Sequence, residues 1–161
     1  MRMKMINVAI LGSILASGAF ADTMVNAQLW DKGADSVNPD LSKPLGMGVK
    51  GANMAMAMVG VKADKTIVAA GTVTFVVTNA SKDIVHEMIL SPVPVDGSPM
   101  PYLTADYKVN EDSAGHLGEV SELEPGKSGR LTVDLKPGKY VLFCNIPAHF
   151  MDGMWTEITV K

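Results

Sequence analysis

Short runs of β-forming residues, separated by Pro-Gly turns, are the feature that most constrains how this chain folds. Pro125-Gly126 and Pro137-Gly138 mark two such turns, and the runs beside them alternate apolar with polar residues. No segment keeps a convincing helical period of 3.6 residues. The chain is therefore predicted to be all-β, as an antiparallel sandwich or barrel. The expected strands are 66–78 with a break at Gly71, 84–90, 130–135, 140–144 and 155–160, with 102–109 as a short strand or part of a connection.

Residues 1–21 have the three parts of a secretory signal peptide. Arg2 and Lys4 make the start positive, 5–18 is an uncharged apolar run, and the segment ends in the small-x-small triplet AFA. The apolar run is shorter than the about 20 residues that a membrane-spanning helix needs. We therefore expect cleavage before Asp22, export to the periplasm, and no stable membrane insertion of the mature chain.

The remaining chain divides by composition into two parts. Residues 22–52 are polar, with scattered Gly, Asp, Asn and Pro, which predicts an irregular N-terminal arm with little core. Residues 53–161 carry the β-type runs and are expected to form one domain. The chain has 14 basic and 17 acidic residues, a net charge of −3, so it lacks the basic excess of a nucleic-acid surface. We expect a monomer that binds no nucleic acid.

The only cysteine, Cys144, lies in a run of soft and nitrogen ligands. Cys144, His149 and Met154 follow the spacing C-x4-H-x4-M between two expected strands, and His86 lies on a strand candidate upstream. A lone cysteine in an exported protein pairs with another chain, stays buried as an inert thiol, or binds a metal. Two histidines and one cysteine with a weak axial methionine are the ligands of a type 1 copper site. This pattern predicts bound copper.

The stretch 138–154, GKYVLFCNIPAHFMDGM, resembles the cupredoxins, and the resemblance extends more weakly over 66–161. The C-x4-H-x4-M loop is similar to those of rusticyanin and auracyanin. The resemblance implies a Greek-key β-sandwich with one type 1 copper ion per chain beneath the loops at one end. It also implies the ligand set, with the equatorial ligands first and the axial one last: His86, Cys144, His149 and Met154.

Two positions depart from the usual cupredoxin pattern. Glu87 follows the first ligand histidine, where many cupredoxins have an Asn or Ser that braces the ligand loop. The string VHEMIL is more similar to periplasmic copper-tolerance cupredoxins, which carry His-Glu at this point. Trp155 follows the axial methionine where a glycine is common, and its bulk is expected to shape the surface beside the site.

Other histidines and methionines leave alternatives open. Met151 competes with Met154 for the axial position, and the spacing and Gly153 favour Met154. His116 lies in a polar stretch and is expected to be an ordinary exposed histidine. Asn145 is expected to make a backbone or loop hydrogen bond and to support the thiolate sulfur.

Met54, Met56 and Met58 alternate with small residues, which predicts that all three lie on one face of a strand. Such a row either fills the core or, joined by Met47, offers thioethers to reduced copper. We favour core packing here.

The ligand set favours a carrier that moves single electrons between redox partners, which would dock near an exposed edge of His149. Copper tolerance or delivery is the alternative, favoured by Glu87 and the methionine row. A cysteine hydrolase using Cys144 is disfavoured because no oxyanion loop or helix N-terminus precedes it. Three histidines cannot build the trinuclear cluster of a multicopper oxidase. We therefore expect no enzymatic activity.

Overall fold

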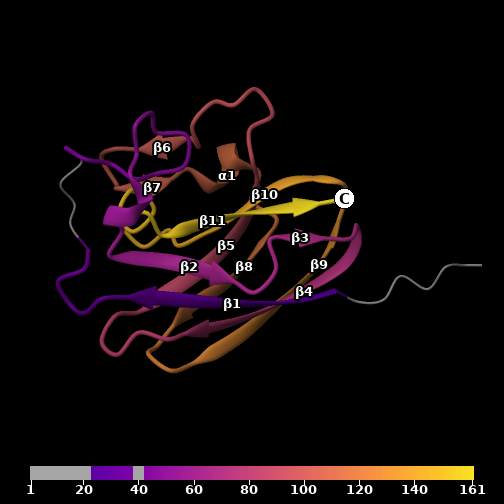
Figure 1. Ribbon diagram of the computed structural model, residues 1–161, viewed down its shortest axis with the longest axis horizontal. Helices are drawn as coiled ribbons and strands as arrows, with labels where there is room; N and C mark the ends of the chain where they lie inside the picture. Colours follow the sequence, from indigo (N-terminus) through magenta and orange to yellow (C-terminus); the bar gives the residue numbers. More distant parts are fainter. Residues whose placement is uncertain (1–22, 38–41) are drawn as a thin grey trace, which may run out of the picture.

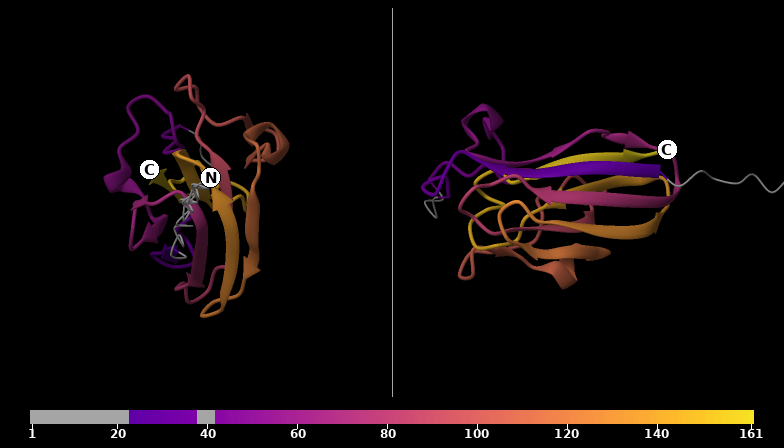
Figure 2. Two further views of the ribbon diagram at one scale, coloured as in Figure 1. Left: turned by 90° about the vertical axis from the view of Figure 1, so that its right-hand side faces the viewer. Right: turned by 90° about the horizontal axis from the view of Figure 1, so that it is seen from below.

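Two β-sheets pack face to face in the computed structural model, which describes residues 23–37 and 42–161 (Figures 1 and 2). The predicted signal peptide and its cleavage site lie outside these residues. One sheet has the order β2-β1-β4-β9, and the other has the order β3-β11-β10-β5-β8. The all-β Greek-key sandwich predicted from the sequence is confirmed. Two strand pairs, β1 with β4 and β3 with β11, are parallel, and the other pairs are antiparallel.

The strands of the first sheet are β1 (Thr23–Asp31), β2 (Val59–Ala63), β4 (Gly71–Asn79) and β9 (Ser128–Leu135). Those of the second are β3 (Ile67–Val68), β5 (His86–Pro92), β8 (Gly118–Leu123), β10 (Gly138–Phe143) and β11 (Trp155–Val160). A small hairpin of β6 (Tyr102–Leu103) and β7 (Lys108–Val109), the 3-10 turn η1 (Met54–Met56) and the short helix α1 (Glu111–Ala114) complete the described elements.

Strands β5 and β10 are buried on both faces, and this is what makes them a rigid base for the site. Met88, Leu90 and Leu142 pack into the core between the sheets, whereas Ile89 and Phe143 pack into a second cluster on the outer face. Strands buried on both sides carry continuous apolar runs, as MIL and YVLF show here. Each fully buried side chain of this size stabilises the fold by about 1.5–3 kcal/mol.

The prediction of an irregular arm over 22–52 is wrong for its first part, because Thr23–Asp31 forms β1 at the centre of a sheet. Val25, Ala27 and Leu29 are 0–2% exposed and face the core, while the residues between them face outward. The alternation of a strand is present over 25–29, but the prediction rests on the polar composition of the whole segment 22–52. Gly71, at φ 116°, does break the run 66–78 into β3 and β4, as predicted.

The prediction that the methionine row packs into the core from a strand is also wrong. The side chain of Asn53 accepts a hydrogen bond from the Ala55 backbone, which caps the 3-10 turn η1. Met54, Met56 and Met58 are 39%, 65% and 43% exposed. A capping asparagine at the start of the row competes with strand formation, and it decides the local structure here.

Strand β8 is not among the strands predicted from the sequence, because its residues are mostly polar. The segment 102–109 forms the β6–β7 hairpin, which covers one end of the second sheet (Figure 1). Among the described residues, no helix is long and apolar enough to cross a membrane.

Candidate metal centre

Three ligand-type side chains from two distant parts of the chain meet at one end of the sandwich. His86 begins β5, and Cys144 and His149 lie on the loop between β10 and β11, residues 144–154, here called the ligand loop. Nδ1 of His149 is 3.2 Å from Sγ of Cys144 and 3.3 Å from Nδ1 of His86. All three residues are buried, with exposed fractions of 0–3%.

This donor set fits copper. When two imidazole nitrogens bind one metal ion at about 2.0 Å, with an angle of roughly 110–120° between the two bonds, the nitrogens lie about 3.3–3.5 Å apart. The two Nδ1 atoms have this separation, and one ligand atom of each of the three residues lies within 4.8 Å of the others. Thiolate sulfur suits reduced copper, and imidazole suits both oxidation states.

Asp31, the last residue of β1, holds the far side of the His86 ring. Its Oδ2 lies 3.1 Å from Nε2 of His86, and its side chain is 3% exposed. Its Oδ1 accepts a hydrogen bond of 2.7 Å from the backbone N–H of Gly33. Burial works to raise the pKa of Asp31, but the hydrogen bonds from Ser81, Gly33 and His86 outweigh it and hold that pKa below its usual value. An ionised Asp31 places the ring proton of His86 on Nε2 and leaves the Nδ1 lone pair toward Nδ1 of His149.

Burial controls the protonation of the ligand groups themselves. It raises the pKa of the Cys144 thiol to about 12. Burial, together with the nearby His86, lowers the pKa of His149 to about 4. Burial also lowers the pKa of His86, against the opposing attraction of Asp31. The metal-free site therefore holds a neutral thiol and neutral imidazoles at pH 7, and binding of a metal to Cys144 must release the thiol proton.

Met154 and Met151, the two candidates for the axial position, lie in different surroundings. Met154 is fully buried, shares the core cluster of Cys144, and its carbonyl accepts a hydrogen bond of 3.1 Å from the Cys144 backbone. Met151 packs instead with the outer cluster, and its sulfur lies against Gly46. The structure therefore groups Met154, and not Met151, with the thiol.

Glu87 braces the ligand loop in place of the usual Asn or Ser. Its Oε1 accepts a hydrogen bond of 3.1 Å from the backbone N–H of Asn145, and its own backbone N–H lies 3.5 Å from the Cys144 sulfur. The Asn145 side chain bonds to backbone groups, as expected, but among the described residues it makes no hydrogen bond to the sulfur. It bonds instead to both backbone groups of Val109 and to Glu111. Burial is the main cause that raises the pKa of Glu87 to about 7.

A segment before β2 lies directly on the ligand loop. The backbone N–H of Leu45 donates to the Met151 carbonyl at 2.6 Å, and the Trp155 indole donates to the Leu45 carbonyl at 2.8 Å. A Cβ added at Gly153 would meet Ala57 Cβ at 3.1 Å and the terminal methyl of Met54 at 3.2 Å. The indole N–H of Trp155 thus anchors this segment beside the site.

The solvent exposure of two histidines, His149 and His116, was also predicted from the sequence. His149 is 3% exposed, so the expectation of an exposed edge on this ring is wrong. The side chain of His116 is 32% exposed and lies 3.8 Å from Glu119, in agreement with the prediction of a surface histidine.

Sequence reasoning missed two contributors to the site, Asp31 and Leu45. The alternation of Val25, Ala27 and Leu29 could have shown a strand that ends at Asp31, but no spacing links that residue to His86. Leu45 acts through its backbone, which leaves no mark in the side-chain pattern.

Comparison with known families agrees with this geometry. Residues 47–161 match the copper-binding proteins of the plastocyanin/azurin family. The chain therefore belongs to this family, with His86, Cys144, His149 and Met154 arranged as a type 1 copper site. No curated protein matches the sequence.

Solved structures with a similar fold include two kinds of small copper protein. Reduced auracyanin from Roseiflexus castenholzii is 19% identical, with 88% of this chain and 98% of that chain covered and a TM-score of 0.50. Rusticyanin from Thiobacillus ferrooxidans is 20% identical over 88% of this chain and 79% of that chain, with a TM-score of 0.52. Auracyanin A from Chloroflexus aurantiacus, a "blue" copper protein, is 18% identical over 88% and 100%, with a TM-score of 0.51. Identities this low establish a shared fold.

Proposed function

We propose that this protein carries single electrons between redox partners and is not an enzyme. The observation that carries the proposal is the ligand set itself, buried and held between inner strands. Bound copper supplies a one-electron couple there. Because β5 and β10 are packed on both faces, the ligands have little room to rearrange when the charge of the ion changes. The fold that this chain shares with auracyanin A, a "blue" copper protein, also supports the proposal.

We assign His86, Cys144 and His149 as the equatorial ligands and Met154 as the axial one. The short distances among the first three support their roles. The axial role of Met154 is supported by its place in the same buried core cluster as Cys144. A thioether is a weak axial donor, which leaves the three equatorial ligands to determine the bond strength.

Partners are proposed to dock beside His149, over the β6–β7 hairpin. The Ala148 backbone donates to the Tyr107 carbonyl at 2.8 Å, and both residues have positive φ, at 73° and 55°. Tyr107 is 36% exposed and Leu103, on the same hairpin, is 41% exposed. An exposed aromatic ring tied to the residue before His149 is a suitable contact for a transient partner.

Electron self-exchange between oxidised and reduced protein tests this function without a known partner. We expect exchange fast enough to broaden the NMR signals of residues near the site in mixtures of the two forms. Tyr107→Glu should slow the exchange, because two like charges then meet at the docking surface. Ile67→Glu is the matched control, since Ile67 is 59% exposed beside Thr159, at the end of β11 far from the ligand loop. Loss of copper on reduction, or equal slowing by both variants, would contradict the proposal.

The proposed location is the periplasm, on the basis of residues 1–21. Intact-mass measurement of the protein from its native host should give a chain that begins at Asp22. A retained Met1 would contradict this location.

Copper tolerance or delivery is a second candidate function. It is favoured by one observation, the exposure of Met54, Met56 and Met58 beside the ligand loop.

A further inference from the structure

The exposed methionines occupy an unusual position for large apolar side chains. Met54, Met56 and Met58 lie within five residues of one another, and each exposes more than a third of its surface. Exposing apolar area to water forgoes about 25 cal/mol for each Å² that could have been buried. Core packing does not explain why these side chains face solvent.

The turn that carries them is fixed to the copper end of the molecule. The hydrogen bonds of Leu45 with Met151 and Trp155 tie the preceding segment to the ligand loop. Met54 reaches that loop directly, with its terminal methyl beside Gly153. The methionine row is far from the ligand loop in the sequence, but these contacts hold it beside the type 1 centre.

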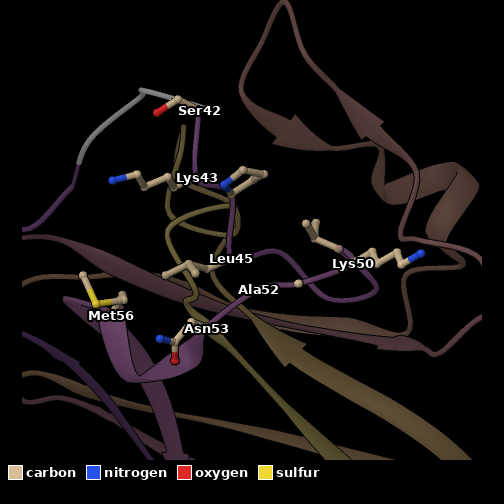
Figure 3. A pocket seen from close by; sticks show the side chains of 10 residues that line it. Ser42, Lys43, Leu45, Lys50, Ala52, Asn53 and Met56 are labelled. Carbon is tan, nitrogen blue, oxygen red and sulfur yellow. The ribbon is translucent and has the colours of Figure 1, made fainter.

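Two of the three methionines line one hollow. Met56 and Met58 line a cavity of about 290 Å³ together with Leu45, Lys43 and Asp152. Figure 3 shows the sulfur of Met56 at the side of the neighbouring hollow, where Leu45 also lies. The shared hollow gives Met56 and Met58 access to a common ion.

The chemistry of this hollow selects a soft ion of low charge. Thioethers are soft donors that carry no charge and lose no proton on binding, so they prefer Cu(I) to Zn²⁺ or Mg²⁺. Lys43 on the wall opposes a divalent ion more strongly than a monovalent one, and Asp152 supplies the balancing negative charge.

We propose that Met56 and Met58 bind one Cu(I) ion at the surface, as a second copper site beside the type 1 centre. Met54, in the same turn and with its terminal methyl beside Gly153, offers a third thioether nearby. The site is independent of the electron-carrier function, since it requires only that the turn η1 and the ligand loop keep their present contact.

Anaerobic titration with Cu(I) against a competing chromogenic Cu(I) chelator tests the proposal. Wild-type protein should retain two Cu(I) ions per chain, and the double variant Met56→Leu, Met58→Leu should retain one. The matched control is Met24→Leu, because Met24 is 44% exposed on β1 but lies about 23 Å along that strand from Asp31. It should retain two ions.

The single variants Met56→Leu and Met58→Leu keep the test valid if the double variant misfolds, and each should weaken binding of the second ion. After reoxidation, all variants should keep the thiolate-to-copper absorption, which shows that the type 1 centre is intact. One Cu(I) per wild-type chain would overturn the proposal. Two ions in both the wild type and the double variant would also overturn it, because the second ion would then lie elsewhere.

Discussion

The ligand loop and the N-terminal segment (residues 23–37 and 42–58) contribute to the same site in different ways. The ligand loop supplies Cys144, His149 and Met154 within eleven residues in a pattern readable from the sequence. The N-terminal segment supplies no equatorial ligand and lies mostly before the family match, which begins at residue 47. It nevertheless holds the His86 ring through Asp31 and covers the ligand loop through Leu45.

This difference separates the residues that bind the metal from the residues that tune the strength of its ligands and the access to it. A motif within one loop specifies which atoms can bind the ion. The strength of the donors and the access of solvent and partners depend on surrounding residues, which can lie anywhere in the chain. Substitutions in the two regions are therefore expected to have different effects on the copper site.

Cys144→Ser has the largest expected effect. The intense absorption of the copper-loaded protein arises from charge transfer between thiolate sulfur and copper, and a serine cannot provide it. Visible spectra of the copper-loaded variant should show complete loss of this band, while far-UV circular dichroism should show the β-fold retained. A variant that keeps the band would show that the ligand loop does not supply the thiolate.

Glu87→Gln tests the connection between the strand of His86 and the ligand loop in the metal-free protein. With a folded pKa of about 7 against an ordinary 4.5, Glu87 keeps a proton in the native state that the unfolded state releases between these pH values. Stability from Glu87 is therefore lost as the pH rises through this window, by on the order of 3 kcal/mol.

The measurement is the difference in free energy of unfolding between Glu87→Gln and wild type, by urea denaturation below pH 4.5 and above pH 7. The difference is needed because His149, with its pKa lowered to about 4, acts in the opposite direction over a similar window. The variant should become more stable relative to wild type as the pH rises. A pH-independent difference would contradict the buried, proton-holding role of Glu87.

Asp31→Asn tests the N-terminal segment. A neutral amide makes His86 a weaker donor, which destabilises Cu(II) more than Cu(I). We expect Cu(II) affinity to fall roughly 10–100-fold, and the reduction potential to rise by about 60 mV for each tenfold change in relative affinity. Voltammetry should show no such rise for Asp64→Asn, an exposed aspartate bonded to Asn26. Equal potentials in the wild type, Asp31→Asn and Asp64→Asn would show that Asp31 does not influence the copper site.

Met154→Leu should keep the copper and its colour but raise the potential, because a weak axial donor stabilises the oxidised ion more than the reduced one. The rise is about 60 mV for each tenfold change in relative affinity. Met151→Leu is the control within the same loop and should change the potential little. The reverse result would assign the axial role to Met151.

Trp155→Phe has the smallest expected effect. It removes the hydrogen bond to Leu45 and should cost about 1 kcal/mol of stability. Hydrogen exchange should become faster at the amide of Leu45, whereas the visible spectrum should stay unchanged. A changed spectrum would show that the covering segment also shapes the copper ligands.

Most of the fold and the ligand set could be predicted from local patterns. Pro-Gly turns and alternation located β9, β10 and β11, and the run 84–90 located β5. Prediction failed for β1, because the polar composition of the surrounding segment outweighed a short alternation. It also failed where a capping Asn53 turned an apparent strand into η1. The expected exposed edge of His149 failed because solvent exposure depends on neighbours that are distant in sequence.

By itself, the sequence determined the class of fold and the chemistry of the four ligand residues, since turn signals and the C-x4-H-x4-M spacing act over a few residues. Only the tertiary structure decided that Asp31 meets His86, 55 residues away, and that Leu45 meets Trp155, 110 residues away. It also decided that the methionine row faces solvent. The physical reason is that such contacts depend on which strands pair and how the sheets pack, and no local spacing records either.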